Sequence, residues 1–233
     1  MTKTKLAKGF TLVELLVVIA IIAALAALST PVVLKQQKKA AATEAVNNAK
    51  QMFILLFEYD QDNGAYPGGA GVNSTNAVSP DSNSAFREFF IASQIDSEEL
   101  FYCKNGLTTG KPDGDLGAAP AYANAMTIGE CGFHYLMKNG TDGHATSSAS
   151  GVPLIITPCD ATTPTALSPF AINPFGGRAI ILFNDGACKS EPITAVGTTG
   201  LVGTVGTGVT NPLDATFPAN VASGGAPVIL PTL

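Results

Sequence analysis

Residues 9–30 have the sequence GFTLVELLVVIAIIAALAALST, an apolar stretch in which Glu14 is the only charged residue. From Phe10 to Leu28 this run is about 19 residues long, close to the ~20 that a helix needs to cross a bilayer core. We therefore predict a membrane-spanning helix. An acidic residue at the centre of such a helix costs on the order of 3 kcal/mol, which indicates a functional group with a partner. The alternative is a glutamate that only reaches the headgroup layer.

The segment before this helix does not resemble an ordinary secretory signal peptide. Its small residue, Gly9, lies before the apolar run and not after it, so cleavage there leaves the helix on the mature chain. Three lysines precede Gly9 at positions 3, 5 and 8. The leader and the start of the helix resemble the type IV prepilin signature, shared by type IV pilins and type II secretion pseudopilins, through Gly9, Phe10, Thr11, Leu12, Glu14 and the uncharged run behind them.

This resemblance implies a processing step and an assembly contact. Prepilin peptidase would remove residues 1–9 by cleaving after Gly9, and would then N-methylate Phe10. Glu14 would become the fifth residue of the mature chain and meet the amino terminus of a neighbouring subunit as a filament grows. The pairing is physically sensible, because opposite charges attract more strongly in a layer of low dielectric constant than in water.

The resemblance predicts a structural subunit of a type IV pilus-like or type II secretion pseudopilus filament, nearest to major pseudopilins. The alternative is a minor pilin or adhesin-type binding module at a filament tip. The implied partners are further copies of the chain, prepilin peptidase, an inner-membrane assembly platform, other minor pilins or pseudopilins, and membrane lipid before assembly. We expect a single-pass inner-membrane protein with its head in the periplasm, which later joins a periplasmic or extracellular filament.

The apolar helix is predicted to continue well beyond the membrane. Residues 10–62 form the expected helical segment, transmembrane to about residue 30 and then amphipathic, because apolar residues recur at helical spacing from Ala42 to Leu56. Pro31 predicts a kink, and it matches a proline that pilins carry near this point and that serves filament packing; an ordinary kink is the alternative. The turn formers of residues 60–64, followed by Tyr66-Pro67, resemble the end of this helix in major pseudopilins.

Residues 63–233 are predicted to form one globular head, giving an α+β fold of the type IV pilin lollipop kind. The expected elements are a helical region over 84–100 and strands over 132–138, 152–157, 178–184 and 188–194, with a hairpin turn at 184–186. A small antiparallel sheet packed on the long helix is the simplest arrangement. The segment 173–177 resembles a turn of major pseudopilins, and the Gly/Thr-rich tail 195–233 is expected to be irregular coil or short edge strands.

The four cysteines all follow the apolar helix and form no CxxC pair. Disulfides in an oxidising compartment are the favoured interpretation, and of the three connectivities we prefer Cys103–Cys131 with Cys159–Cys188. Each bond would close a loop of roughly 28 residues and stabilise the head by about 3 to 4 kcal/mol. Buried free thiols are the alternative.

Composition does not indicate catalysis or nucleic-acid binding. The net charge is -5, no basic stripe interleaved with aromatic residues is present, and no nucleophile or phosphate-loop motif occurs. We therefore predict a protein that is not an enzyme and has no cofactor, no metal and no nucleic-acid partner. Asp113 and Asp115 are weak evidence for a metal, whereas His134 and His144 are expected to be packed and solvated, respectively.

Overall fold

The computed structural model describes residues 10–68, 81–104, 110–127, 129–138, 143–159, 170–196, 202–205 and 228–229. Its first element is helix α1, Leu12–Asn63, which runs without interruption through Pro31. The predicted long helix is confirmed and extends slightly beyond the expected end. It stops at Gly64, whose φ of +78° places it in the left-handed region and whose N–H donates to the Asp60 carbonyl at 2.7 Å.

The chain divides into two units, residues 1–37 and residues 38–233. In the first unit every described side chain is exposed, including the apolar residues from Phe10 to Leu34. By length and composition the apolar part of α1 is able to cross a membrane. The second unit has its own hydrophobic core, to which the remainder of α1 belongs.

From Lys38 onward α1 is amphipathic, as predicted. One side is buried in the core through Ala41, Ala42, Ala45, Ala49, Met52, Leu56 and Tyr59, positions that recur every three or four residues. The opposite side, which includes Thr43, Asn47 and Lys50, is exposed. At the start of this segment the small alanine side chains let the rest of the head pack close to the α1 backbone, and further along the larger side chains of α1 fill the core.

The predicted helical region over 84–100 is split into two elements. Helix α2 spans Ser82–Ile91, and its N-terminus is capped by the Asp81 carboxylate, which accepts from Ser84 N at 2.7 Å. A short 3-10 helix, η1, spans Glu98–Phe101. The further turn that residues 96–99 were expected to start is η1, and α2 ends before Ser93, whose positive φ of 57° does not continue an α-helix.

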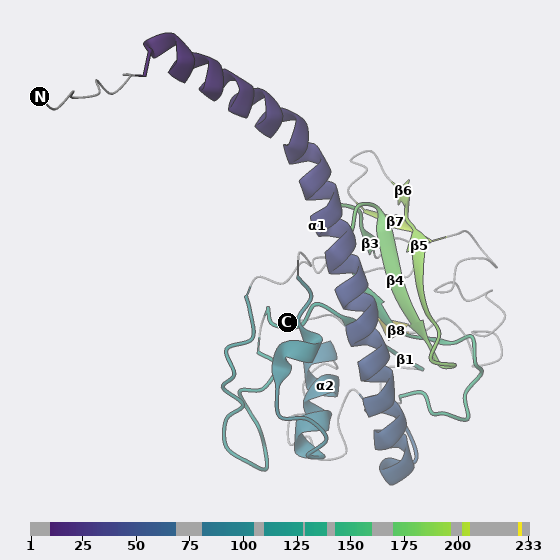
Figure 1. The fold of residues 1–233 in the computed structure, drawn as a ribbon. Helices are drawn as coiled ribbons and strands as arrows, with labels where there is room; N and C mark the ends of the chain where they lie inside the picture. Colours follow the sequence, from purple (N-terminus) through teal and green to yellow (C-terminus); the bar gives the residue numbers. More distant parts are fainter. Residues whose placement is uncertain are drawn as a thin grey trace, which may run out of the picture. The chain divides into compact units, whose positions relative to one another are not determined.

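After η1 the described residues form eight strands, in two antiparallel sheets (Figure 1). The five-stranded sheet has the order β5-β4-β2-β1-β8 and the three-stranded sheet has the order β3-β7-β6. The four predicted strands are confirmed as β1, β2, β4 and β5. The bounds are β1 His134–Met137, β2 Pro153–Thr157, β3 Phe170–Ala171, β4 Arg178–Phe183, β5 Cys188–Pro192, β6 Thr194–Val196, β7 Val202–Thr204 and β8 Val228–Ile229.

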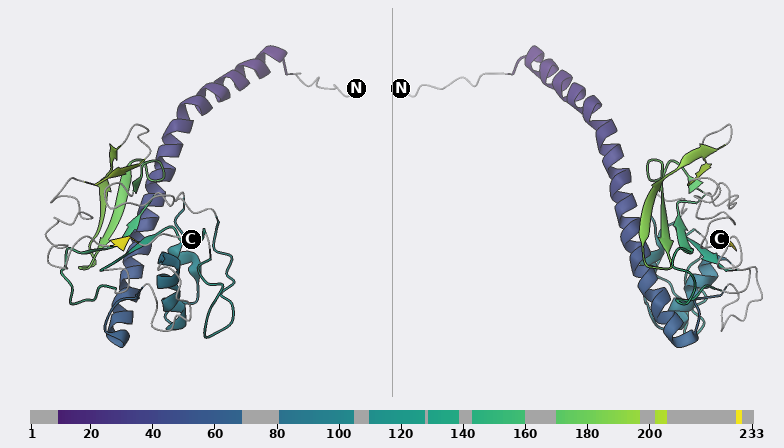
Figure 2. Two further views of the ribbon diagram at one scale, coloured as in Figure 1. Left: turned by 180° about the vertical axis from the view of Figure 1, so that it is seen from behind. Right: turned by 90° about the vertical axis from the view of Figure 1, so that its right-hand side faces the viewer.

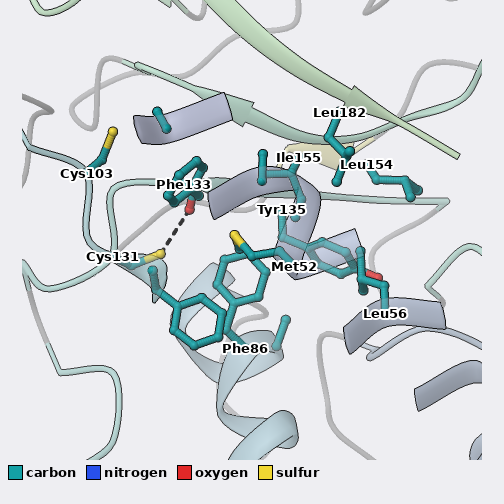
Figure 3. Packing of buried hydrophobic residues seen from close by; sticks show 14 of the residues in the cluster. Met52, Leu56, Phe86, Cys103, Cys131, Phe133, Tyr135, Leu154, Ile155 and Leu182 are labelled. Atoms are coloured by element: carbon teal, nitrogen blue, oxygen red, sulfur yellow. Dashed lines mark hydrogen bonds between the residues drawn. The ribbon is translucent and has the colours of Figure 1, made fainter. Parts of the chain in front are cut away.

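The five-stranded sheet separates two hydrophobic clusters. On one face α1 and α2 contribute Met52, Leu56 and Phe86, which lie close to Tyr135 of β1 and to β2 and β4 (Figure 3). On the other face a smaller cluster includes Leu136 and Ile156. The central strands β1, β2 and β4 are therefore buried on both sides, and the chain has the predicted α+β fold with an antiparallel sheet.

The predicted hairpin joins β4 to β5 and brings the sheet against α1. Gly186 has a φ of +76°, and a Cβ added there would lie 3.0 Å from Cε1 of Phe53. The turn over 173–177 precedes β4, and its Phe175 is buried in the core. Glycine at position 186 thus serves both the turn and the close approach to the helix.

Candidate functional site at the start of the apolar helix

The first turn of α1 is closed by a reciprocal pair of side chains, Thr11 and Glu14. Glu14 Oε2 accepts from the Thr11 backbone N–H at 2.8 Å and from the Thr11 hydroxyl at 2.7 Å. The Glu14 backbone N–H in turn donates to Thr11 Oγ1 at 3.3 Å. This is a capping box, in which the N-cap residue and the residue three positions later satisfy each other's backbone donors.

The capping box gives Glu14 a local role that the sequence analysis missed. The signal was present, because Thr-x-x-Glu before an apolar run is the pattern of a capping box. Both bonds that Glu14 accepts use Oε2, and within the described residues Oε1 makes no hydrogen bond. The carboxylate is thus held in a fixed place at the positive end of the helix dipole, with one oxygen available to another donor.

The other predicted residues of this region have different surroundings. Gly9 lies outside the described residues. Phe10 immediately precedes the capped turn and is 77% exposed. Pro31 lies within α1, one residue after Thr30, whose hydroxyl donates to the Ala26 carbonyl at 2.7 Å. Among the described residues, the hydrogen bonds of the Glu14 side chain go to Thr11 and to neither Phe10 nor Pro31.

The start of the chain matches a known protein family. Residues 4–30 match the family described as the prokaryotic N-terminal methylation motif. The chain carries the signature of type IV pilins and pseudopilins. The pilin-type motif spans the leader, Phe10, the capping box and the apolar part of α1, and it does not extend to the head. No curated protein matches the chain. No solved structure matches it either.

The predicted disulfides are not formed in the structure, where Cys103, Cys131 and Cys188 are free thiols. The Cys159–Cys188 pairing is wrong, because Cys188 lies opposite Leu182, which lies opposite Ile155. Cys159 is four residues beyond Ile155, so its Cα lies about 13 Å along the strands and about 10 Å across them from the Cα of Cys188. A disulfide requires Cα atoms within about 7 Å. The preference for this pair rested on loop length, which says nothing about strand register.

Cys103 and Cys131 do lie in one region of the core (Figure 3). A Cβ added at Gly132 would be only 2.3 Å from the Cβ of Cys103. The Cys131 thiol donates to the Phe133 carbonyl at 3.0 Å, whereas Cys103 accepts from the Thr157 hydroxyl at 3.8 Å. Burial raises the pKa of both thiols to about 12, which disfavours the thiolate needed for oxidation. Their pairing stays a prediction.

Three carboxylates gather beside η1: those of Glu98, Asp113 and Glu130, with one oxygen of each within 4.8 Å of the others. Oxygen ligands of this kind suit a hard divalent cation. However, Glu98 already accepts from the N–H groups of Met126 and Gly114, and Glu130 from those of Asp113 and Thr127. These bonds explain the positions of both buried acids without an ion.

The sequence analysis had paired Asp113 with Asp115, and the structure instead gives Asp115 a different task. Its carboxylate accepts from the Gly117 N–H at 3.0 Å and from the Asn124 side-chain amide at 2.8 Å, which holds the loop together. Burial raises the pKa of Glu98, and the nearby charges of Glu130 and Asp113 raise it further. Glu98 and Glu130 were missed because they come together only in the folded chain.

The two histidines are both buried, at 3% exposure each. The prediction that His134 is packed is confirmed. The prediction that His144 is solvated was wrong, because its loop lies against Tyr66, whose backbone N–H donates to the His144 carbonyl at 2.8 Å. Burial lowers the pKa of each imidazole to about 4. Among the described residues neither ring has a hydrogen-bond partner, so we assign both to packing.

Proposed function

We propose that this protein is a structural subunit of a pilus-like or pseudopilus filament, polymerised through its amino-terminal helix. The observation that carries the proposal is a long exposed apolar helix, within a pilin-type motif, whose single carboxylate is fixed by Thr11. The role is structural and not enzymatic.

Processing makes Glu14 useful in assembly. Cleavage after Gly9 by prepilin peptidase converts the Phe10 nitrogen from a peptide N–H into a cationic amine, which is then methylated. Glu14 Oε1 of a neighbouring subunit accepts from this amine, while Oε2 retains the capping box. In an apolar layer an unpaired charge is costly, so each end of the pair specifies where the next helix lies.

The remaining assignments follow from this role. The mature chain starts at residue 10; residues 10–62 form the helix, transmembrane to about residue 30, and residues 63–233 form a periplasmic or extracellular head. Before assembly the apolar part of α1 lies in the inner membrane, in contact with lipid. Pro31 contributes to packing in the filament, and the assembly platform and other minor pilins or pseudopilins are further partners. The alternative, a minor pilin or adhesin at a tip, differs in being sparse along the filament.

Mass spectrometry of the mature protein tests the processing step. In a host that has prepilin peptidase, the chain is expected to begin at a methylated Phe10, and it should retain its leader when the peptidase is deleted. An intact Met1 terminus in the host with peptidase would contradict the proposal. Electron microscopy of sheared filaments, with antibody against the head, then distinguishes a main subunit labelled along the whole length from a tip subunit.

A further inference from the structure

A cluster of lysines lies directly after the apolar part of α1. Lys35, Lys38 and Lys39 are the first charged residues after Glu14, and Glu44 is the next acidic residue along the chain. No acid lies three or four residues from any of the three lysines, which is the spacing of an ion pair within a helix. This lysine cluster is therefore a concentrated positive charge with no partner on its own helix turn.

The lysine cluster lies one bilayer thickness from Glu14. Lys35 is 21 residues beyond Glu14, which is about 31 Å along an α-helix. The hydrocarbon core of a bilayer is about 30 Å thick, and residues 15–34 carry no charge. When α1 spans the membrane with Glu14 at one edge of the core, Lys35 reaches the headgroup layer at the other edge. Lys38 and Lys39 then lie within that layer.

The three lysines share one side of α1. Their spacings of three and four residues place them within about 100° of one another around the helix, which Figure 2 shows as continuous through this segment. Lys38 precedes Ala42 by four residues and Ala45 by seven, so it lies on the side of α1 that is buried further along. Lys35 and Lys39 are exposed and Lys38 is half-buried. Three ammonium groups are thus presented together just before the buried side of α1 begins.

Processing makes this cluster the dominant positive charge at the membrane. In the unprocessed chain the lysines at positions 3, 5 and 8 balance it on the other side of the apolar run. Cleavage after Gly9 removes those three lysines and leaves the Phe10 amine and Glu14, whose charges are opposite. The mature chain then has its excess of lysine at the exported end of the span, against the usual bias of basic residues toward the cytoplasm. This placement indicates a negatively charged ligand on the exported side.

We propose that Lys35, Lys38 and Lys39 bind the phosphate groups of anionic phospholipids in the leaflet that faces the head. Lysine ammonium groups donate charge-assisted hydrogen bonds to phosphate oxygens, and lysine side chains near a bilayer surface extend toward the headgroups. The contact holds the mature subunit at a fixed depth in the membrane until it joins a filament. This proposal rests on the proposed function, which places the head on the exported side, and it names the class of lipid that the subunit binds there.

The chain contains no tryptophan, so one introduced tryptophan can report on the lipid beside the cluster. Leu28 is seven residues before Lys35, on the same side of α1 and about 10 Å closer to the bilayer centre. The full-length Leu28→Trp chain is reconstituted in vesicles of phosphatidylcholine and phosphatidylglycerol, with dibrominated acyl chains on one lipid at a time to quench the tryptophan on contact. We expect phosphatidylglycerol to be preferred beside the reporter by about fivefold or more at low salt. The preference should fall as the salt concentration rises.

Three variants of the reporter chain assign the preference to the cluster. The first neutralises the cluster and should abolish the preference: Lys35→Gln, Lys38→Gln and Lys39→Gln. The second places arginine at the same three positions and should retain the preference, because arginine keeps the charge and also binds phosphate. The matched control removes three exposed lysines outside the cluster and should also retain it: Lys50→Gln, Lys111→Gln and Lys189→Gln.

The lipid contact is overturned if the Leu28→Trp chain shows no preference for phosphatidylglycerol, or if the neutralised variant keeps that preference. Loss of the preference in the matched control would also overturn it, because net charge and not the cluster would then be the cause. A neutralised variant that keeps the lipid preference but forms no filaments would assign the cluster to a neighbouring copy instead. If the unaltered chain forms no filament, the proposed function fails, whereas the lipid preference is measured in vesicles and is judged separately.

Discussion

Separate substitutions at Thr11 and Glu14 should distinguish the capping role of Glu14 from its role as a charge. Glu14→Gln retains a side-chain oxygen that can accept from the Thr11 N–H, so it preserves the capping box and removes only the charge. Thr11→Ala removes the hydroxyl but leaves the backbone N–H and the carboxylate. Glu14→Ala removes both functions.

The two roles differ in size. Loss of an N-cap side chain costs about 1 kcal/mol, which corresponds to roughly a fivefold effect on an equilibrium. Leaving a partner's charge unpaired in an apolar layer costs about 3 to 5 kcal/mol, which exceeds a hundredfold. We therefore expect Thr11→Ala to assemble within about fivefold of the parent chain, and both Glu14 variants to assemble more than about a hundredfold less.

The assay is the fraction of subunit recovered in sheared, sedimented filaments, quantified by immunoblot. Membrane fractionation confirms insertion of each variant, and mass spectrometry confirms that each is cleaved and methylated, because the substitutions lie close to the processing site. If Glu14→Gln assembles like the parent while Thr11→Ala is as impaired as Glu14→Ala, capping alone explains Glu14 and the reasoning about a neighbour's amine is refuted.

Further predictions concern the head, measured as the free energy of unfolding of the full chain in detergent. Burial lowers the pKa of His134 to about 4, so the contribution of His134 to the free energy of unfolding is fully present above about pH 6.5. Between pH 6.5 and pH 4 the free energy of unfolding falls by about 1.4 kcal/mol per pH unit, because the unfolded chain binds a proton that the folded chain does not. His134→Leu should flatten this decline, and an unchanged slope would contradict the assignment. Gly143→Ala places a Cβ 2.4 Å from the Tyr66 carbonyl oxygen and should cost about 1 to 3 kcal/mol. Gly110→Ala, whose Cβ would lie 4.0 Å from the Gly129 carbonyl oxygen, an ordinary contact distance, should be nearly neutral. Glu98→Ala leaves two backbone donors without their acceptor and should cost about 1 to 3 kcal/mol, with Glu98→Gln costing clearly less; equal losses would count against the hydrogen bonds as the cause.

Local patterns were sufficient to predict the long helix and four strands. The spacing of Ala42, Ala45 and Ala49 specified the buried side of α1, and the glycine at position 64 specified its end within a few residues. Thr11 and Glu14 form an equally local pattern, the Thr-x-x-Glu of a capping box, which by itself specifies where α1 starts.

What the sequence could not predict depends on contacts between distant segments. Glu98 and Glu130 approach Asp113 because the loop over 110–127 packs against η1, and the spacing of these residues in the sequence does not predict this contact. The separation of Cys159 from Cys188 depends on strand register, which a loop-length argument ignores. A separate turn at residues 96–99 was expected from the sequence, but the positive φ of Ser93 just after α2 has no sequence signature.

The pairing of β1 with β8 sets an order of events for a chain made from its amino terminus. Leu136 and Met137 find their antiparallel partners only at Ile229 and Val228, near the carboxyl end of the sequence. Until residues 228–229 have been synthesised, one side of β1 lacks its partner strand and exposes unpaired backbone groups, the kind of edge that other chains can bind. If the proposed function holds, copies gathered in the membrane by their helices would meet one another with that edge open, and rapid synthesis as far as Ile229 would limit pairing of β1 with the wrong chain.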